Sequence, residues 1–333
     1  MFGNRVIIAV AAAALLCVSA TTSTAQDSEV PGYTVVHGWP SLPPGEMLGQ
    51  ATGVGLDSAG RVFVFHRAGR IWTEPFPTER IARPTIHVFN GDTGAFVRAW
   101  GSGLFIMPHG LTIDGSDNVW VTDVGLHQVF KFSPEGELLL TLGEAGVSGD
   151  DAAHFNLPTD VAVLPDGSFF VSDGYANTRV MKFSAEGRFL FQWGRPGAGP
   201  GEFNLPHAID VDSEGRVYVA DRSNARVQVF DGAGRYLTEW NSEAIGRPYS
   251  VALSRSGAPR ALVLDGGDQP ESPPDRSGAT VVTLDGQVLN AFGRFGPYDG
   301  QFRLAHDGAI ARDGSLYVVD AHGQRVQKFI PTP

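Results

Sequence analysis

The sequence predicts an all-β fold: a six-bladed β-propeller with four antiparallel strands in each blade. One observation is a repeated unit, in which a short apolar strand, a tight turn and a second apolar strand recur six times along the 333 residues. A second is the spacing of the aspartates that close the last five units, which lie 50, 48, 44 and 55 positions apart. A third is the content of 42 glycines and 22 prolines, which suits a turn-rich chain. A period of about 50 residues with four strands per unit is typical of propellers. The six units lie at 54–65, 111–123, 161–173, 209–221, 251–265 and 308–320.

Each unit has the sequence of a β-hairpin, with turns that read SAGR, SDN, PDGS, SEGR, RSGA and RDGS. Two further strands follow most hairpins, as at 128–133 and then 138–142. The last unit has three evident strands and ends at 325–330, whereas a strand at 33–39 precedes the first unit. We expect this N-terminal strand to join the last blade as its fourth strand, because the ring then closes without an open sheet edge.

Residues 1–25 have the pattern of a removable signal peptide, and residues 26–333 are expected to form a single propeller domain. Arg5 supplies a positive charge, residues 6–20 are apolar, and Ser23-Thr24-Ala25 offers a cleavage site of small residues. The apolar run is short for a membrane span, so no stable membrane anchor is expected. These features predict an exported protein, periplasmic or extracellular. Cys17 is the only cysteine, so the exported chain would contain no disulfide.

The charge balance argues against a nucleic-acid partner. Asp and Glu number 36 against 25 Lys and Arg, a net charge of −11, and only three of the cations are lysines. Such a surface repels a phosphate backbone. We expect a monomer that acts on a small molecule or a peptide.

Three histidines share one place in the repeat. His109, His207 and His306 each lie 14 residues before a closing aspartate, in blades two, four and six. The other three blades have Thr52, Thr159 and Tyr249 there. Alternate blades of a six-membered ring are about 120° apart, so the three imidazoles would converge in the central channel as the base of a catalytic zinc site. Any one of them alone could be an ordinary channel-lining residue. The remaining histidines lack this spacing. We expect His66 to be structural, in the place that Asp fills in later blades, and the rest to be solvated or in loops: His37, His87, His127, His154 and His322.

Residues just after each closing position share the face of the histidines, because the two strands of the hairpin are antiparallel. Arg67, Tyr175 and Arg222 fall there, and two guanidiniums with a phenol suit an anionic ligand. The alternative is that the arginines form salt bridges between blades. The long insertions 68–83 and 266–277 leave the same face and could wall a substrate cleft, with Trp72 and Phe76 as apolar contacts, or be loops without function. The five repeated aspartates are expected to cap turns.

Several motifs resemble the lyase domain of peptidylglycine α-amidating enzymes, in order and over nearly the whole chain after residue 25. The longest run is Pro108-His109-Gly110-Leu111, Trp120-Val121-Thr122-Asp123 and Leu126-His127-Gln128-Val129-Phe130-Lys131. The others are Val64-Phe65-His66-Arg67, Pro158-Thr159-Asp160-Val161, Val171-Ser172-Asp173-Gly174-Tyr175 and Val219-Ala220-Asp221-Arg222.

The resemblance implies a six-bladed propeller of NHL-type repeats, and it assigns roles to single residues. Zinc would be held by His109, His207 and His306, with Tyr175 as the catalytic tyrosine and Arg67 and Arg222 as active-site arginines. A structural calcium would be held by the carbonyls of Val54 and Leu111 and the carboxylate of Asp307, and oxygen ligands are those that calcium prefers. The chain departs from the animal members by lacking two disulfides, with Asn156, Ala176, Tyr218 and Val229 near the matching places, and by lacking the proline before His306.

The activity that the resemblance implies is cleavage of the C–N bond of peptidyl-α-hydroxyglycine, which yields a peptide amide and glyoxylate. In this hypothesis zinc lowers the pKa of the substrate hydroxyl, Tyr175 accepts its proton, and the arginines hold the carboxylate. Two alternatives remain open. The lyase could act on another small carbinolamide, such as a ureidoglycolate-like compound, or the propeller could be non-catalytic and bind a protein or a glycan.

Overall fold

The computed structural model describes residues 1, 3, 32–267 and 276–332 of the chain. Contacts divide the chain into two units, Met1–Val30 and Pro31–Pro333. The second unit contains every strand described below. The predicted signal peptide, 1–25, lies almost wholly outside the described residues. Within those residues no helix has the length and apolarity needed to cross a membrane.

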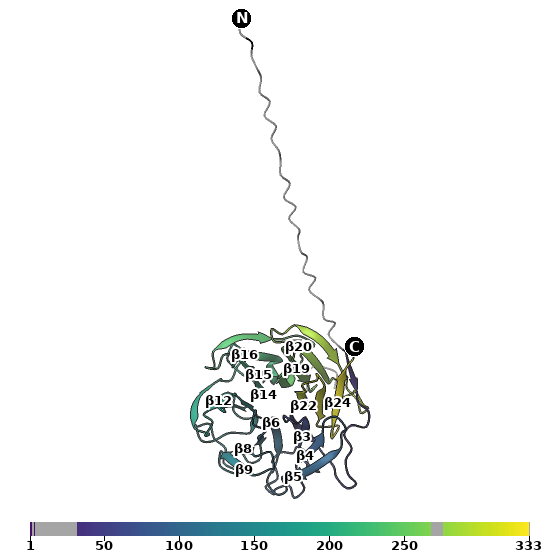
Figure 1. Ribbon diagram of the computed structural model, residues 1–333. Coiled ribbons are helices and arrows are strands. Elements are labelled where there is room, and N and C mark those ends of the chain that lie inside the picture. Colours follow the sequence, from purple (N-terminus) through teal and green to yellow (C-terminus); the bar gives the residue numbers. More distant parts are fainter. Residues whose placement is uncertain (2, 4–31, 268–275, 333) are drawn as a thin grey trace. The chain divides into compact units, whose positions relative to one another are not determined.

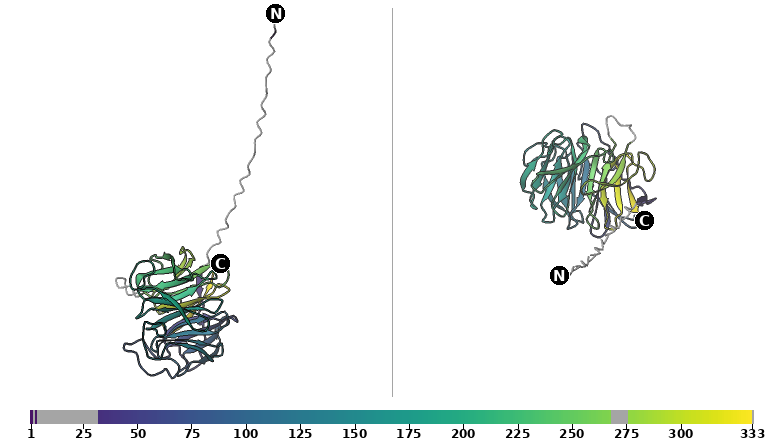
Figure 2. Two further views of the ribbon diagram at one scale, coloured as in Figure 1. Left: turned by 90° about the vertical axis from the view of Figure 1, so that its left-hand side faces the viewer. Right: turned by 90° about the horizontal axis from the view of Figure 1, so that it is seen from above.

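The six-bladed propeller that the repeats predict is confirmed (Figure 1). Six four-stranded antiparallel sheets form the blades; the first strand lies innermost in blades one to five, and β22 lies innermost in blade six. Figure 2 shows the strands of neighbouring blades side by side across the thickness of the ring. The strands of blades one to three are β2 (Ala51–Leu56), β3 (Arg61–His66), β4 (Ile86–Asn90), β5 (Phe96–Trp100), β6 (Pro108–Ile113), β7 (Val119–Asp123), β8 (Gln128–Phe132), β9 (Leu138–Leu142), β10 (Pro158–Val163), β11 (Phe169–Asp173), β12 (Arg179–Phe183) and β13 (Phe189–Trp193). Those of blades four to six are β14 (Pro206–Val211), β15 (Val217–Asp221), β16 (Arg226–Phe230), β17 (Tyr236–Trp240), β18 (Pro248–Leu253), β19 (Arg260–Asp265), β20 (Gly278–Thr283), β21 (Val288–Phe292), β22 (Ala305–Ile310), β23 (Leu316–Asp320), β24 (Arg325–Pro331) and β1 (Tyr33–Val35).

The N-terminal strand closes the ring as expected, but it is shorter than the sequence predicts. Strand β1 pairs with β24 as the outermost strand of the last blade, with Val35 opposite Phe329. The expected strand ran on to Trp39. Instead the indole of Trp39 leaves the sheet and packs on Phe89 and Tyr317, with ring centroids 6.1 and 4.9 Å away. This large side chain is thus buried between blades one and six, beyond the end of the strand.

The core lies between the blades. Each of six buried apolar clusters joins two adjacent blades, as where Phe63 and Phe65 of blade one meet Leu111 and Val121 of blade two. Second strands such as β7, β11 and β15 are buried along their whole length, because both of their faces are covered by neighbouring blades. Among the described residues, the only helical element is a 3₁₀ turn, η1 (Arg222–Asn224).

Candidate active site

A β-bulge in each innermost strand turns one residue into the channel. The pairing of β14 with β15 shifts between Pro206 and Ala208, so His207 stands out of the ladder. Bulges re-aim side chains in this way and often lie beside functional sites. The other innermost strands shift at the equivalent place, and in blade two the shift also takes in Gly110. The six residues presented in this way are Thr52, His109, Thr159, His207, Tyr249 and His306. The equivalence that the sequence spacing predicts is thus confirmed, including Tyr249 in blade five.

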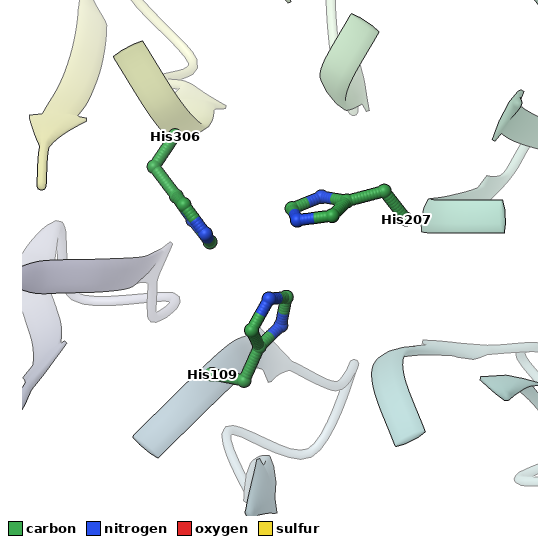
Figure 3. A group of neighbouring side chains, drawn as sticks. All are labelled: His109, His207 and His306. Carbon is green, nitrogen blue, oxygen red and sulfur yellow. The ribbon is translucent and has the colours of Figure 1, made fainter. Parts of the chain in front are cut away.

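The three histidine side chains meet in the channel, as Figure 3 shows. Their ring centroids are 4.8, 4.9 and 5.0 Å apart, a nearly equilateral triangle. All three are buried, and one nitrogen of each lies within 4.8 Å of the other two. Three imidazoles that share one zinc ion at about 2.0–2.1 Å place their centroids about 5 Å apart. The arrangement therefore fits a three-histidine metal site.

The backbone of the neighbouring blade orients each imidazole. The Nδ1 atoms of His109, His207 and His306 lie 2.7, 2.6 and 2.8 Å from the carbonyl oxygens of Thr159, Tyr249 and Thr52. A carbonyl only accepts, so each Nδ1 carries the proton and donates, which leaves the Nε2 lone pair free for a metal.

The electrostatics also favour neutral, metal-binding imidazoles. Burial, followed by the charge of Arg67, lowers the pKa of His109 to about 3. Burial and the neighbouring imidazole of His109 likewise hold the pKa values of His207 and His306 well below the usual range. All three rings are therefore neutral at neutral pH, with a proton on Nδ1 and none on Nε2, the state in which histidine binds metals.

Tyr175 lies directly over this centre. Its hydroxyl is 3.0 Å from Nε2 of His109 and 3.0 Å from Nε2 of His207. The backbone beside it passes so close to the carbonyl oxygen of Pro206 that a Cβ on Gly174 would lie 1.8 Å from that atom. Only glycine fits there, and the tight approach brings Tyr175 against His207. Trp72, from the first long insertion, packs against the phenol ring, with the two ring centroids 5.0 Å apart and the ring planes tilted by 41°.

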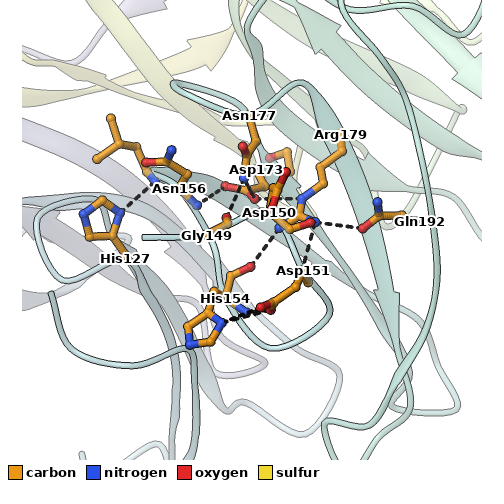
Figure 4. Close-up of polar contacts among 12 residues, drawn as sticks. His127, Gly149, Asp150, Asp151, His154, Asn156, Asp173, Asn177, Arg179 and Gln192 are labelled. Carbon is orange, nitrogen blue, oxygen red and sulfur yellow. Dashed lines mark hydrogen bonds and ion pairs between the residues drawn. The ribbon is translucent and has the colours of Figure 1, made fainter. Parts of the chain in front are cut away.

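A buried polar network lies behind the Tyr175 loop (Figure 4). The carboxylate of Asp173 accepts hydrogen bonds from the backbone N–H of Asn156, the side-chain amide of Asn177 and Nε of Arg179, at 2.9, 2.7 and 3.0 Å. Arg179 donates further bonds to Gln192 and to backbone oxygens, among them the carbonyl of His154 at 2.8 Å. The network ties the two segments that flank Tyr175 together, where the animal relatives are expected to have a disulfide.

The two arginines come from blades one and four, and each directly follows the second strand of its blade. Arg67 is buried, and it donates from Nε to the carbonyl of Pro108 at 3.0 Å and from Nη1 to the side-chain oxygen of Gln50 at 2.7 Å. Burial lowers its pKa to about 10, against the charges of Tyr175 and Asp123. The guanidinium of Arg222 lies 3.8 Å from the ring centroid of Tyr249 and donates to its hydroxyl. Arg222 also bears electrostatically on all three histidines.

A polar cavity of about 120 Å³, whose lining does not include the three histidines, lies among the innermost strands. It is lined by Val54, Leu111 and Asp307 together with Asp160 and Asp210. The carboxylate of Asp307 accepts from the Ser250 hydroxyl at 2.7 Å and from the backbone N–H of Val54 at 2.9 Å. Burial raises the pKa of Asp307 to about 6, and burial together with Asp307 raises that of Asp160 well above its usual range. Desolvated carboxylates that repel one another fit a cation.

Asp307 is among the residues expected at this cavity from the sequence, whereas Asp160 and Asp210 are not. A signal for Asp160 existed, because it follows the bulged Thr159 as Asp307 follows the bulged His306. The expectation that His87 is solvated or in a loop is wrong. His87 lies in β4, is 1% exposed and contacts His66. The expectation that the repeated aspartates cap turns is confirmed for Asp123, Asp265 and Asp320, which accept from the backbone N–H groups of Leu126, Gly267 and Gly323 in the turns that follow them.

Comparisons with known proteins agree with this architecture. A family model described as "NHL repeat" matches residues 105–132 and 203–230. Peptidyl-glycine alpha-amidating monooxygenase B of Xenopus laevis is 38% identical over 313 residues, 88% of this chain and 35% of that protein. Peptidyl-alpha-hydroxyglycine alpha-amidating lyase 1 of Drosophila melanogaster is 35% identical over 328 residues, 90% of this chain and 60% of that protein. The chain thus spans at most about three fifths of the length of these curated relatives.

Solved structures support the fold alone. A streptogramin B lyase superposes with a TM-score of 0.58 at 12% identity, covering 90% of this chain and 98% of that one. A gluconolactonase from Xanthomonas campestris does so with a TM-score of 0.58 at 14% identity, covering 86% and 87%. The sequence relatives are far more similar than these, and they span nearly the whole propeller with identities of 35–38%. The chain belongs to the family of peptidyl-α-hydroxyglycine α-amidating lyases.

Proposed function

We propose that this protein is a zinc-dependent lyase that cleaves the C–N bond of peptidyl-α-hydroxyglycine, or of a similar N-acyl-α-hydroxyglycine, to an amide and glyoxylate. The observation that carries the proposal is the Tyr175 hydroxyl, 3.0 Å from the Nε2 atoms of two of three converging, neutral histidines. A base and a metal site thus face the same small volume. The names of the relatives describe this chemistry, and family membership extends it to this chain.

The residues divide the work in a simple way. His109, His207 and His306 would hold the zinc ion, which when bound acidifies the α-hydroxyl of the substrate. Tyr175, as phenolate, accepts the hydroxyl proton. The C–N bond then breaks as the C–O bond becomes a carbonyl, and the same proton returns to the amide nitrogen. The products are therefore R–CO–NH₂ and glyoxylate, with no other reactant consumed.

Arg67 and Arg222 would bind the carboxylate that becomes part of glyoxylate. Both guanidiniums lower the pKa of His109 and His306, so their positive charge reaches the reaction centre. Attraction between Arg67 and ionised Tyr175 works in both directions: it raises the pKa of the arginine and favours the phenolate. A guanidinium is well suited to this task, since it binds carboxylates through two parallel hydrogen bonds.

We further propose that the cavity of Val54, Leu111 and Asp307 holds a structural calcium ion. Its ligands would be the backbone carbonyls of Val54 and Leu111 and the carboxylate of Asp307, three residues that line the cavity, and oxygen ligands are those that calcium prefers. A bound cation would offset the repulsion between Asp307, Asp160 and Asp210. We also propose that residues 1–25 direct export and that residues 26–333 form the single catalytic domain.

The test is a glyoxylate-release assay on protein purified without a metal-chelating tag, with its metal content measured. We expect stoichiometric zinc, and turnover of an α-hydroxyglycine-capped peptide. Tyr175→Phe keeps the ring contacts with Trp72 and His109, so it should retain zinc and lose about 10²- to 10⁴-fold in kcat, the range for loss of a general base. Full activity of Tyr175→Phe would exclude the tyrosine as the base. Absence of zinc and of turnover would favour the non-catalytic binding propeller, and turnover of small ureido- or acylamino-glycolates alone would favour the second alternative.

A further inference from the structure

The last residue of each second strand is equivalent in all six blades. Each is paired in the ladder with the residue just before the bulge of the innermost strand. Five blades have aspartate at this place, and blade one has histidine. These six residues, the closing residues, are His66, Asp123, Asp173, Asp221, Asp265 and Asp320.

A closing aspartate comes with an arginine in four blades. In blades three, four and six the arginine opens the third strand and lies opposite the aspartate in the ladder, and in blade five Arg276 contacts Asp265. The Nε–carboxylate distances in those three blades are 3.0, 2.8 and 3.2 Å. Blades one and two differ, because Thr85 lies opposite His66 and Gln128 lies opposite Asp123. Around Arg67, therefore, no arginine of the third strand is present to neutralise a carboxylate.

In blade one His66 stands in place of the aspartate, and it begins a row of hydrogen bonds that runs through His87 to Glu46. The backbone N–H of Ala68 donates to its Nδ1 at 3.0 Å, so in the neutral ring Nε2 carries the proton. That Nε2 contacts Nδ1 of His87, whose Nε2 lies 3.0 Å from the carboxylate of Glu46. One set of tautomers satisfies all three contacts, with each N–H donating outward toward Glu46. The row ends in a negative charge that is one-third exposed and separated from Arg67 by two imidazoles.

The hydrogen bond that His66 accepts from Ala68 also fixes the backbone around Arg67. Ala68, which follows Arg67, has a left-handed φ of 49°, an uncommon conformation for a residue with a side chain. Its N–H bond to His66 holds that turn, and the turn aims Arg67 at Pro108 and Gln50. His66 itself is fully buried, and burial and His87 keep its pKa well below the usual range, so the imidazole remains uncharged.

We infer that His66 is a positioning residue for the reaction: it closes the first blade as a neutral side chain and so leaves Arg67 available to the carboxylate of the substrate. The charge count supports this. Asp123 of the next blade already attracts Arg67, and a carboxylate at position 66 would add a second negative charge one residue away in the chain, with no arginine of the third strand to pair with it. Arg222 shows the other solution, because it follows a closing aspartate, Asp221, that Arg226 binds at 2.8 Å.

The inference rests on the proposed function, and its test compares five proteins loaded with zinc: wild type, His66→Asn, His66→Asp, His66→Asp with Thr85→Arg, and Arg67→Ala as the reference for lost carboxylate binding. Asn and Asp have nearly the same shape, so the first two variants differ in charge alone. The double variant rebuilds the Asp–Arg pair of the other blades. Each protein is assayed for kcat and KM with an N-acyl-α-hydroxyglycine and for glyoxylate binding by calorimetry. Thermal melting and zinc content are measured in parallel.

We expect His66→Asn to remain within about fivefold of wild type in kcat/KM, and His66→Asp to lose a further 10- to 100-fold, about the worth of one charged hydrogen bond, mostly through KM. Glyoxylate should bind more weakly to the Asp variant by a similar factor. Adding Thr85→Arg to the His66→Asp protein should recover at least about a fifth of the lost kcat/KM and of the lost glyoxylate affinity. Equal values for the Asn and Asp variants, or no recovery in the double variant, would overturn the inference.

Two further outcomes separate this inference from the proposed function. If wild type releases no glyoxylate, the lyase proposal fails whatever the variants do. If His66→Asp does not fold, the double variant still decides the matter. Suppose that its Asp–Arg pair restores folding but that it binds glyoxylate as weakly as the Arg67→Ala protein. That result contradicts a role for His66 in keeping Arg67 available to the substrate.

Discussion

Replacing Arg179 by methionine tests whether the network behind the Tyr175 loop sets the geometry of the active site. The change removes a guanidinium that is almost fully buried and that binds Asp173, Gln192 and backbone oxygens of the segment before β10. Methionine fills similar volume. Asp173, which has no exposed surface, is left without its cation.

The magnitude follows from that burial. Breaking one side of a buried ion pair costs about 3–5 kcal/mol, because the other charge remains desolvated. For a domain of this size that corresponds to a fall in Tm of about 6–10 °C. Burial already raises the pKa of Asp173, and loss of Arg179 raises it further. A carboxyl with a raised pKa destabilises the fold most when it must ionise, so the loss should be larger at pH 8 than at pH 5.5.

The assay is thermal melting together with kcat and metal content. We expect the Arg179→Met protein to keep its metal and to lose at least about tenfold in kcat, since small displacements of a catalytic group are costly. Removing both partners, as Asp173→Asn with Arg179→Met, should recover part of the lost stability. Arg325→Met is the matched control, because Arg325 makes the equivalent pair with Asp320 in blade six, where no proposed catalytic residue follows. A Tm change below about 1 °C, or an equal loss of kcat in the Arg325→Met protein, would refute the reasoning.

Three other predictions concern pH, substrate and calcium. Burial lowers the pKa values of His66 and His87, so below pH 6.5 the unfolded chain binds protons that the folded chain does not. The free energy of unfolding should therefore fall on acidification by up to about 1.4 kcal/mol per pH unit for each histidine. Denaturant melts of His66→Gln should show a weaker dependence of this free energy on pH. Trp72 packs at a tilt against Tyr175, and its ring centroid lies 5.0 Å from the guanidinium carbon of Arg67. Trp72→Ala should therefore lower kcat/KM about tenfold for substrates with a bulky apolar acyl group and less for N-acetyl-α-hydroxyglycine, as a substrate series would show. Asp307→Asn should make the melting temperature insensitive to added calcium, whereas wild type should gain several degrees at saturating calcium; identical shifts in both proteins would contradict calcium binding at this cavity.

The ring and the metal site could be predicted because both are periodic. A closing aspartate every 44 to 55 residues sets the blades, and a histidine 14 residues before every second one places three imidazoles on one axis. What the period of the repeat does not encode is the bulge that turns His207 and its equivalents inward. A local signal exists in four blades, where Pro108, Pro158, Pro206 and Pro248 precede the bulge, because strands accept proline mainly at their first position or at bulges. Blades one and six have Ala51 and Ala305 there, so in those blades the sequence does not mark which residue leaves the ladder.

The burial of His87 was missed for a different reason. Within a blade, the second and third strands are covered on both faces, so they do not alternate between apolar and polar residues. A polar side chain in such a strand therefore gives no sign of whether it faces solvent or a partner. His87 and His66 are 21 residues apart, on adjacent strands, and only the fold brings them into contact. Asp160 and Asp307, 147 positions apart in sequence, meet in the channel for the same reason.

The alternation of blades explains why three ligands suffice to build the site. Even blades supply the histidines, and odd blades supply the carbonyl oxygens, from Thr159, Tyr249 and Thr52, that fix their Nδ1 protons. The two threonines also donate forward, from their hydroxyls to the carbonyls of Pro108 and Pro206, the residues that precede His109 and His207. The bonds thus run from blade to blade around the channel, and each imidazole is held by a strand other than its own. A tyrosine can replace the threonine in blade five because the carbonyl orients His207, which frees the Tyr249 ring to pack on His207 and Arg222. The site is consequently a property of the closed ring, since no single blade contains both a ligand and the group that orients it.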